Sequence, residues 1–432
     1  MRKNVFLAMA ALVLLALSAC AYDGRTTDVE IDLGETVYFY GVEKTTEPVD
    51  LLIWLDNEEW AHELIRAFVS QNPHGNVSVR FEQMGNVASR THMQLDGPAG
   101  FGADIFAFPH DHVSWAINDG MIEPVPMALQ QKWQAELQEA AVGTITHNGF
   151  MYGVPFQVEN IALFYNRDLW GPQPPRTFEE IFAFAQTWNN PATNDWTMAW
   201  PVNDPYFNFP WLAVEGFRPF GPDMTDYRRP GFDSPEVARG LEFFLQLRDL
   251  FDLPLADINF NTAEERFRLG EIPLTITGPW AFTDLFANNV NFGVTTIPTI
   301  GGVQPTAFSG TMIAGVSSFS SEINRPWAYA FLDFMVSEEG ARIQFEGIHT
   351  MTARRDISGI PGLRDDPHLA GIIAQSPFTV PMPLIPQVHS MWGPMEEMLS
   401  FVWDRDLSIP EAQTRAMESY TTLLAVAGIH ID

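Results

Sequence analysis

Strand-like and helix-like segments alternate at the start of this chain's folded part, and this order restricts the fold more than any other feature. The apolar run Val49–Leu55 is followed by a segment whose apolar residues recur every fourth position from Trp60, as on one face of a helix. Residues 77–81 alternate apolar and polar side chains, and a weaker helical pattern leads to a third apolar run at residues 105–108. This β-α-β-α-β order predicts an α/β fold with a mainly parallel sheet and right-handed crossovers.

The third strand runs into a group of polar side chains that suggests a ligand site. Pro109 interrupts it, and Asp111 follows just before a helical pattern begins. Because open α/β sheets bind ligands beyond the carboxyl ends of their strands, we expect Asp111 to lie near Glu58 and Glu59, which follow the first strand. The alternatives are that Asp111 only caps the next helix, and that the two glutamates form a solvated first helical turn favoured by the helix dipole.

A metal site is a further possibility at the same position. His110, Asp111 and His112 are consecutive, and both residue types are metal ligands. Nothing else in the sequence supplies a matching cluster, however, so we predict neither a metal nor a cofactor.

A second series of strand and helix patterns follows without a Gly/Ser-rich linker. Asn148-Gly149 predicts a two-residue hairpin, and residues 158–165 predict a long apolar strand that carries Glu159 near its start. Further helices are predicted to begin after Thr177, after Ser234 and at Thr262, and a strand at 272–277 stops just before Trp280. We therefore predict two lobes whose chain crosses back and forth, with Glu159 on a crossing. The predicted N-terminal lobe comprises 49–157 and 311–360, and the C-terminal lobe comprises 158–310 and 361–432.

The first 20 residues have the pattern of an export signal. Arg2 and Lys3 precede an apolar stretch too short for an ordinary membrane span, and the segment LSAC ends at Cys20, the chain's one cysteine. This matches a bacterial lipobox, so we predict a lipoprotein signal peptide at 1–20, lipidation of Cys20 and a polar tether at 21–48. A general signal peptide with an incidental cysteine is the alternative. We expect an extracytoplasmic protein, in the periplasm or at the cell surface, that meets the membrane only through its lipid anchor.

The charge of the chain excludes some partners. With 54 acidic and 24 basic residues the formal net charge is −30. Such a charge repels nucleic acid and anionic lipid surfaces and favours a soluble surface. We therefore predict no nucleic-acid partner and a monomeric protein.

Several segments resemble the maltose- and maltodextrin-binding proteins of bacterial ABC importers, which are extracellular solute-binding proteins. The resemblance rests on segments that occur in family order from about residue 49 to the C-terminus: GADIFAFPHDHVSWAINDGMIEPV, NGFMYGVPFQVENIALFYNRDL, DPYFNFPW, LGEIPLTITGPWAF, VNFGVTTIPTIGGVQPTAFSGTMIAGVSS and MPLIPQVHSMW. It implies the periplasmic-binding-protein fold: two α/β lobes, several hinge crossings and a central cleft that binds oligosaccharide without chemistry on it.

The resemblance also implies site residues, position by position. Asp111 and Glu159 match family carboxylates that bind sugar hydroxyls, while Glu58 stands in place of Asp and Asp204 in place of Glu. The aromatic positions of the family are occupied here by Phe108, Tyr206, Trp280 and Trp392, of which Phe108 replaces a Trp. The chain departs from the family at Glu59, where maltose binders have Lys, and at His112 and Glu396, where they have Arg. The acidic and aromatic half of the site is kept and the basic half is lost, which leaves the sugar open.

These residue types suit a neutral sugar. Aromatic faces cover the C–H patches of a pyranose, and carboxylates accept hydrogen bonds from its hydroxyl groups. We therefore predict a non-enzymatic solute-binding protein that delivers an oligosaccharide to ABC permease subunits. Two alternatives are a secreted glycoside hydrolase, which needs a pair of carboxylates across the scissile bond, and a receptor that presents its bound ligand to a sensor protein.

Overall fold

The computed structural model describes residues 30–33, 36–39, 48–71, 77–251, 253–255 and 258–430. The predicted signal peptide and Cys20 lie outside these residues. Within the predicted tether the structure contains a two-stranded antiparallel pair, β1 (Glu30–Leu33) and β2 (Thr36–Phe39). No helix in the described part of the chain combines the length and the apolar character needed to cross a bilayer.

The first lobe is built on a seven-stranded sheet with the order β14-β8-β13-β5-β3-β4 and with β15 beside the start of β13. Strands β3, β4 and β5 are parallel, as the strand–helix alternation predicts, whereas β13 runs antiparallel to β5 and β8. The strands are β3 (Val49–Leu55), β4 (Val77–Gln83), β5 (Ile105–Pro109), β8 (Val154–Asn160), β13 (Ala307–Val316), β14 (Met351–Thr352) and β15 (Thr379–Pro381).

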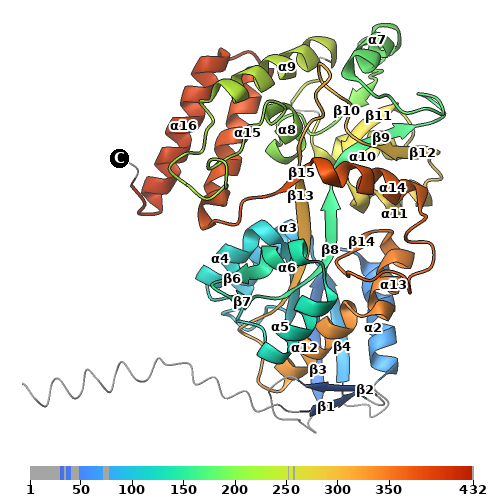
Figure 1. Ribbon diagram of the computed structural model, residues 1–432, viewed down its shortest axis with the longest axis vertical. Coiled ribbons are helices and arrows are strands. Elements are labelled where there is room, and N and C mark those ends of the chain that lie inside the picture. Colours follow the sequence, from blue (N-terminus) through green and yellow to red (C-terminus); the bar gives the residue numbers. More distant parts are fainter. Residues whose placement is uncertain are drawn as a thin grey trace, which may run out of the picture.

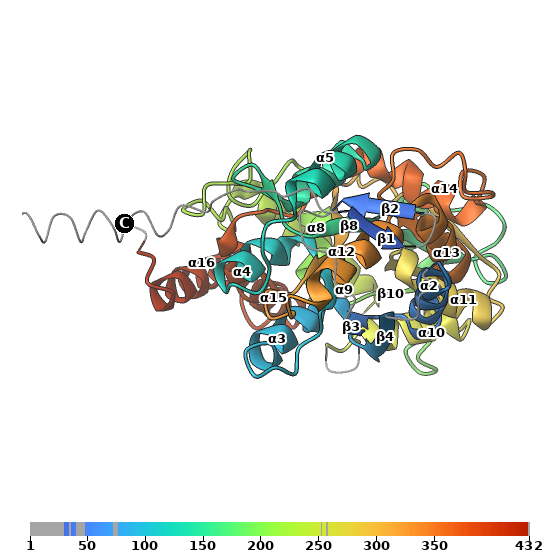
Figure 2. The same cartoon turned by 90° about the horizontal axis from the view of Figure 1, so that it is seen from below.

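Helices surround this sheet (Figure 1) and bury its apolar side chains. Seen from below, α2, α3 and α5 lie on three different sides of α12 (Figure 2). The helices of this lobe are α2 (Glu58–Ser70), α3 (Asn86–Asp96), the 3₁₀ turn η1 (His110–His112), α4 (Val113–Asn118), α5 (Met127–Glu136), α6 (Glu139–Ile145), α12 (Asn324–Met335) and α13 (Glu338–Ile348).

The second lobe has its own hydrophobic core and a four-stranded sheet with the order β10-β11-β9-β12. Its strands are β9 (Ala162–Asn166), β10 (Met198–Ala199), β11 (Leu274–Thr277) and β12 (Phe292–Thr295). Its helices are α7 (Phe178–Trp188), α8 (Pro205–Leu212), α9 (Pro235–Phe251), α10 (Phe260–Arg268), η2 (Pro279–Ala281), α11 (Phe282–Ala287), α14 (Pro367–Gln375), η3 (Ser376–Phe378), η4 (Pro386–Val388), α15 (His389–Trp403) and α16 (Ile409–Val426).

The chain passes between the two cores at the strands drawn upright in the middle of Figure 1. Buried residues up to Phe156 belong to the first core and those from Ile161 to the second, and the reverse change occurs within β13, between Phe308 and Met312. The prediction of one long strand at 158–165 is wrong. Ile161 separates β8 from β9, and the two strands belong to different sheets.

Local sequence signals predicted turns and helix caps more accurately than they predicted the lengths of strands. Asn148 and Gly149 both have positive φ, 50° and 83°, between β6 (Thr146–His147) and β7 (Phe150–Met151), as a type I′ hairpin requires. Asn57 and Thr177 cap α2 and α7 with their side chains. The predicted start of α10 at Thr262 is wrong: Asn259 is the N-cap, and Thr262 is the third helical residue that completes a capping box.

Gly240 of α9 tests how tightly the second lobe is packed, and Gly143 of α6 in the first lobe serves as the control. A Cβ at Gly240 of α9 would lie 2.6 Å from the Trp211 carbonyl oxygen and 2.7 Å from Leu212 Cα of α8, whereas a Cβ at Gly143 of α6 would have no atom within 4 Å. We expect Gly240→Ala to lower the free energy of unfolding by about 1–3 kcal/mol through overpacking. Gly143→Ala should raise it by about 0.5–1 kcal/mol through helix propensity. Urea unfolding of both variants measures the difference, and equal effects would contradict the close packing of α8 on α9.

Candidate ligand-binding site between the lobes

The acid at the end of the first strand is Asp56, which directly follows β3. Its carboxylate accepts a hydrogen bond from Asn86 Nδ2 at 2.6 Å. The side chain keeps exposed surface, yet the protein around it removes enough water to raise its pKa to about 6. Glu58 and Glu59, which the sequence placed in the site, are exposed in the first turn of α2. Asp56 is thus the acid nearest the end of β3, and the assignment of Glu58 and Glu59 to the site stays a prediction.

Glu159 lies on β8, two residues before the crossing at Ile161, and is half-buried. Burial raises the pKa of its carboxyl to about 7; the hydrogen bond from Gln157 Nε2, 2.6 Å from Glu159 Oε2, opposes this and the charge of Asp56 adds to it. A Cβ at Gly310 on the neighbouring strand would lie 3.0 Å from Glu159 Oε1. A glycine at 310 thus leaves room for the carboxylate.

Acidic side chains from both lobes act on Tyr206. Within the part of the chain that the structure describes, its buried hydroxyl has no hydrogen-bond partner, and its pKa is raised by burial and then by the charges of Glu159, Asp204 and Asp111. Asp204 is the N-cap of α8 and accepts from the Tyr206 backbone N–H at 2.8 Å. Burial raises the Asp204 pKa to about 6, and the charge of Glu396 contributes. The structure therefore assembles Asp111, Glu159, Asp204 and Tyr206 from segments distant in sequence.

Aromatic rings form a continuous group beside these acids. Trp280 lies 6.5 Å from Tyr206 between ring centroids, and Phe308 lies 6.4 Å from Tyr206 and 5.9 Å from Trp392. The Trp280 Nε1–H donates to Glu264 at 2.7 Å, so one edge of the indole is fixed. A Cβ at Gly278 would lie 2.3 Å from Trp280 Cζ3. Only a glycine at 278 allows the indole to fold back at the end of β11.

Two further residues of the first lobe have different surroundings from those predicted. Phe108 is 0% exposed and packs against Phe106 in the core of the lobe, so its ring has no free surface for a ligand. His112 is 8% exposed and faces the second lobe, where its ring centroid lies 5.1 Å from that of His389 at the start of α15.

His389 was not singled out from the sequence, although it precedes Trp392 by one helical turn. Its ring stacks on Trp115 with centroids 3.5 Å apart and planes 5° apart, and Arg90 lies 3.9 Å from the Trp115 ring. Burial lowers the pKa of His389 to about 3, and the charges of His112 and Arg90 act in the same direction. Close by, Ser114 Oγ donates to the Leu384 carbonyl oxygen at 2.6 Å. This is a direct contact between the lobes.

The chemistry of the assembled group suits a polyhydroxylated neutral ligand. Asp56, Glu159 and Asp204 are all partly exposed, yet each has a pKa raised mainly by loss of water. These carboxyl groups therefore keep some accessible surface while much of the surrounding water is displaced by protein. The hydroxyl groups of such a ligand would donate hydrogen bonds to these carboxylates. The neighbouring aromatic faces would cover its apolar C–H surface.

Comparison with known proteins supports this interpretation. Residues 63–371 match the family described as Bacterial extracellular solute-binding protein. The maltotriose-binding protein of Pyrococcus abyssi is 24% identical over 74% of this chain and 69% of its own length. The maltooligosaccharide ABC transporter solute-binding lipoprotein of Streptococcus pneumoniae serotype 4 is 23% identical over 98% of this chain and 96% of its own.

A solved structure has the same two-lobed fold. The Thermus thermophilus maltotriose-binding protein, bound to maltotriose, superposes with a TM-score of 0.78 and 26% identity over 87% of this chain and all of its own. These relatives are binding proteins and not enzymes, which agrees with the prediction of a non-enzymatic solute-binding protein. The fold, the family match across most of the chain and the resemblance noted in the sequence agree: the chain belongs to the bacterial extracellular solute-binding proteins.

Proposed function

We propose that this protein binds maltooligosaccharides, or closely related neutral oligosaccharides, in a cleft between its lobes and delivers them to an ABC permease. The observation that carries the proposal is the buried hydroxyl of Tyr206, which has no hydrogen-bond partner among the described residues and whose pKa is raised by burial and then by the charges of Glu159, Asp204 and Asp111. Tyr206, Trp280 and Trp392 provide aromatic surface for the sugar rings. The maltotriose and maltooligosaccharide binders among the relatives support the sugar class.

The proposed site differs from the sequence prediction at Glu58, Glu59 and Phe108. Asp56 takes the role first assigned to Glu58, because it is the acid whose charge acts on Glu159. Glu59 and Glu58 then act at the rim, and Phe108 belongs to the core of the first lobe, where it packs against Phe106. We propose that the lost positive charge at Glu59, His112 and Glu396 shifts preference away from ordinary maltose.

The proposal includes an anchor and a mode of action. Cys20 would carry the lipid, so the protein works outside the cytoplasmic membrane on a tether. The lobes proposed from the sequence, 49–157 with 311–360 and 158–310 with 361–432, would close on the sugar by a hinge motion. A permease would recognise the closed form, whose population the ligand raises.

A thermal-shift panel tests the sugar class. We expect maltotriose or a longer maltodextrin to raise the melting temperature by several degrees, because a ligand at 100 times its Kd adds about 2.7 kcal/mol to the free energy of unfolding. The panel should include glucose, maltose, a galacto-oligosaccharide, amino acids and a peptide. A shift with amino acids or peptides alone would reject the proposal. Incubation with maltotriose serves as a control, since released glucose would show hydrolysis and not binding alone.

A further inference from the structure

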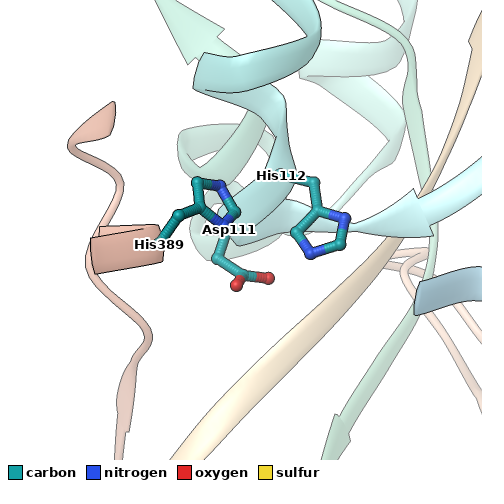
Figure 3. Close-up of side chains that lie close together, drawn as sticks. All are labelled: Asp111, His112 and His389. Atoms are coloured by element: carbon teal, nitrogen blue, oxygen red, sulfur yellow. The ribbon is translucent and has the colours of Figure 1, made fainter. Parts of the chain in front are cut away.

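We propose that Asp111, His112 and His389 form a binding site for a divalent transition-metal ion of the zinc type, which links the two lobes. Figure 3 shows the Asp111 carboxylate below and between the two imidazole rings. One ligand atom from each of the three residues lies within 4.8 Å of the other two. The objection drawn from the sequence, that no third ligand accompanies Asp111 and His112, is removed because α15 supplies His389.

Asp111 and His112 are buried and His389 is partly buried, and each carries a buried polar atom without the partner that such atoms normally have. Asp111 is 4% exposed and His112 is 8% exposed. Asp111 Oδ1, His112 Nδ1 and His389 Nε2 all lack a hydrogen-bond partner among the described residues. Because an unsatisfied buried polar group costs about 1–3 kcal/mol, three such atoms in one place indicate that something outside the protein chain satisfies them.

The ligand set selects the class of ion. Two imidazoles and one carboxylate suit Zn²⁺, Ni²⁺ and Cu²⁺, whereas Mg²⁺ and Ca²⁺ prefer oxygen ligands. A tetrahedral Zn²⁺ holds its N and O ligands at about 2.0–2.2 Å, so the side chains of Asp111 and His112 would move toward His389 to bring the three ligand atoms, now within 4.8 Å of one another, around the ion. Three protein ligands leave a fourth position for water or a hydroxyl group.

The surroundings hold the ligands in place. His389 is held by its stack on Trp115 and by a hydrogen bond with the Asp111 backbone, while its Nε2 atom has no partner among the described residues. Arg90, on the ring of Trp115, is a nearby positive charge that opposes cation binding, although Asp119 partly compensates it at 3.9 Å. The net charge of −30 raises the local concentration of cations around the whole molecule.

The ligands of the proposed metal site come from both lobes, so metal binding would affect how the lobes are arranged. Asp111 and His112 lie on η1, next to Val113 and Ala116 of the first core, whereas His389 begins α15, whose residues Met391 and Met395 belong to the second core. An ion held by all three can bind only when the lobes are together. Metal binding therefore favours the closed arrangement.

Isothermal titration calorimetry of sugar-free protein with ZnCl₂ tests the proposal independently of the sugar specificity. We expect one Zn²⁺ per chain in the wild type and at least about 100-fold weaker binding in His389→Phe, because loss of a ligand exceeds the 10–100-fold effect of outer-shell partners. Phenylalanine keeps the stack on Trp115. His92→Phe is the matched control, since His92 lies 3.8 Å from Asp96 without a third ligand.

Two further measurements distinguish a specific metal site from diffuse binding of cations. MgCl₂ should give no comparable isotherm, and Co²⁺ should give the visible absorption of a four-coordinate site in the wild type but not in Asp111→Asn. The proposal is overturned if Zn²⁺ binds equally well to wild type and His389→Phe, if it binds only as several weak ions that Mg²⁺ replaces, or if it does not bind.

Discussion

Replacement of Glu159 by glutamine is expected to weaken oligosaccharide binding about tenfold while raising the stability of the free protein at neutral to alkaline pH. The loss arises because a charge-assisted hydrogen bond contributes about 1.5–3 kcal/mol and a neutral one about 0.5–1.5 kcal/mol. Calorimetric titration with the best ligand of the thermal-shift panel measures it. Glu397→Gln, at an exposed position of α15, is the matched control and should bind as the wild type does.

The stability change has a defined pH dependence. The Glu159 pKa is raised from its ordinary value of 4.5 to about 7, so the folded protein holds this proton more tightly than the unfolded chain. The stabilisation that the protonated Glu159 carboxyl gives to the folded protein is therefore fully present below about pH 4.5 and is lost as the pH rises through 7. We expect Glu159→Gln to gain about 1–3 kcal/mol over the wild type at pH 8 and almost nothing at pH 4.5. An equal gain at both pH values would contradict the proposed burial of this carboxyl.

Truncation of Trp280 to alanine is expected to weaken oligosaccharide binding about 30- to 100-fold. The reason is loss of a large aromatic face, since burial of apolar surface contributes about 25 cal/mol per Å² and a Trp side chain buries up to about 250 Å². Trp280 belongs to the aromatic group that includes Tyr206 and Phe207, at centroid distances of 6.5 and 6.2 Å.

The control for this variant is Trp188→Ala. Trp188 is also half-buried and packs on Phe184 of the same helix, 5.4 Å between ring centroids, but it lies on α7, away from the acids of the site. Calorimetric titration of both variants, with circular dichroism to confirm folding, completes the comparison. Binding of Trp280→Ala within about twofold of the wild type would remove Trp280 from the site.

Much of the local structure could be predicted from the sequence because the signals are short-range. The strand Val49–Leu55, the face of α2 that begins with Trp60, and the Asn148-Gly149 turn follow from periodicity and turn chemistry alone. The break at Ile161 could not be predicted, because Ile161 and all of β9 are apolar or buried and nothing in the local sequence marks a change of sheet there. Burial also conceals the role of Phe108, since every residue of β5 is buried and no alternation distinguishes one face from the other.

The site was predictable where strand ends supply the residues. Asp111 followed from that rule, and Asp56 could have been found by the same rule, because it is the first residue after its strand. His389 had no such signal. Its proximity to His112 depends on how α15 of the second lobe packs against η1 of the first, and a contact between residues so distant in sequence is invisible to local patterns.

In the hinge motion proposed above, the distance of each binding group from the crossing at Ile161 would set how far it travels. Glu159 is two positions from Ile161, so it would move little between an open and a closed arrangement. His112 of the first lobe and His389 of the second, whose ring centroids lie 5.1 Å apart in the structure, would separate as the lobes move apart. A sugar would thus meet a nearly fixed carboxylate first, and the distance between the two histidines would measure how far the lobes have closed.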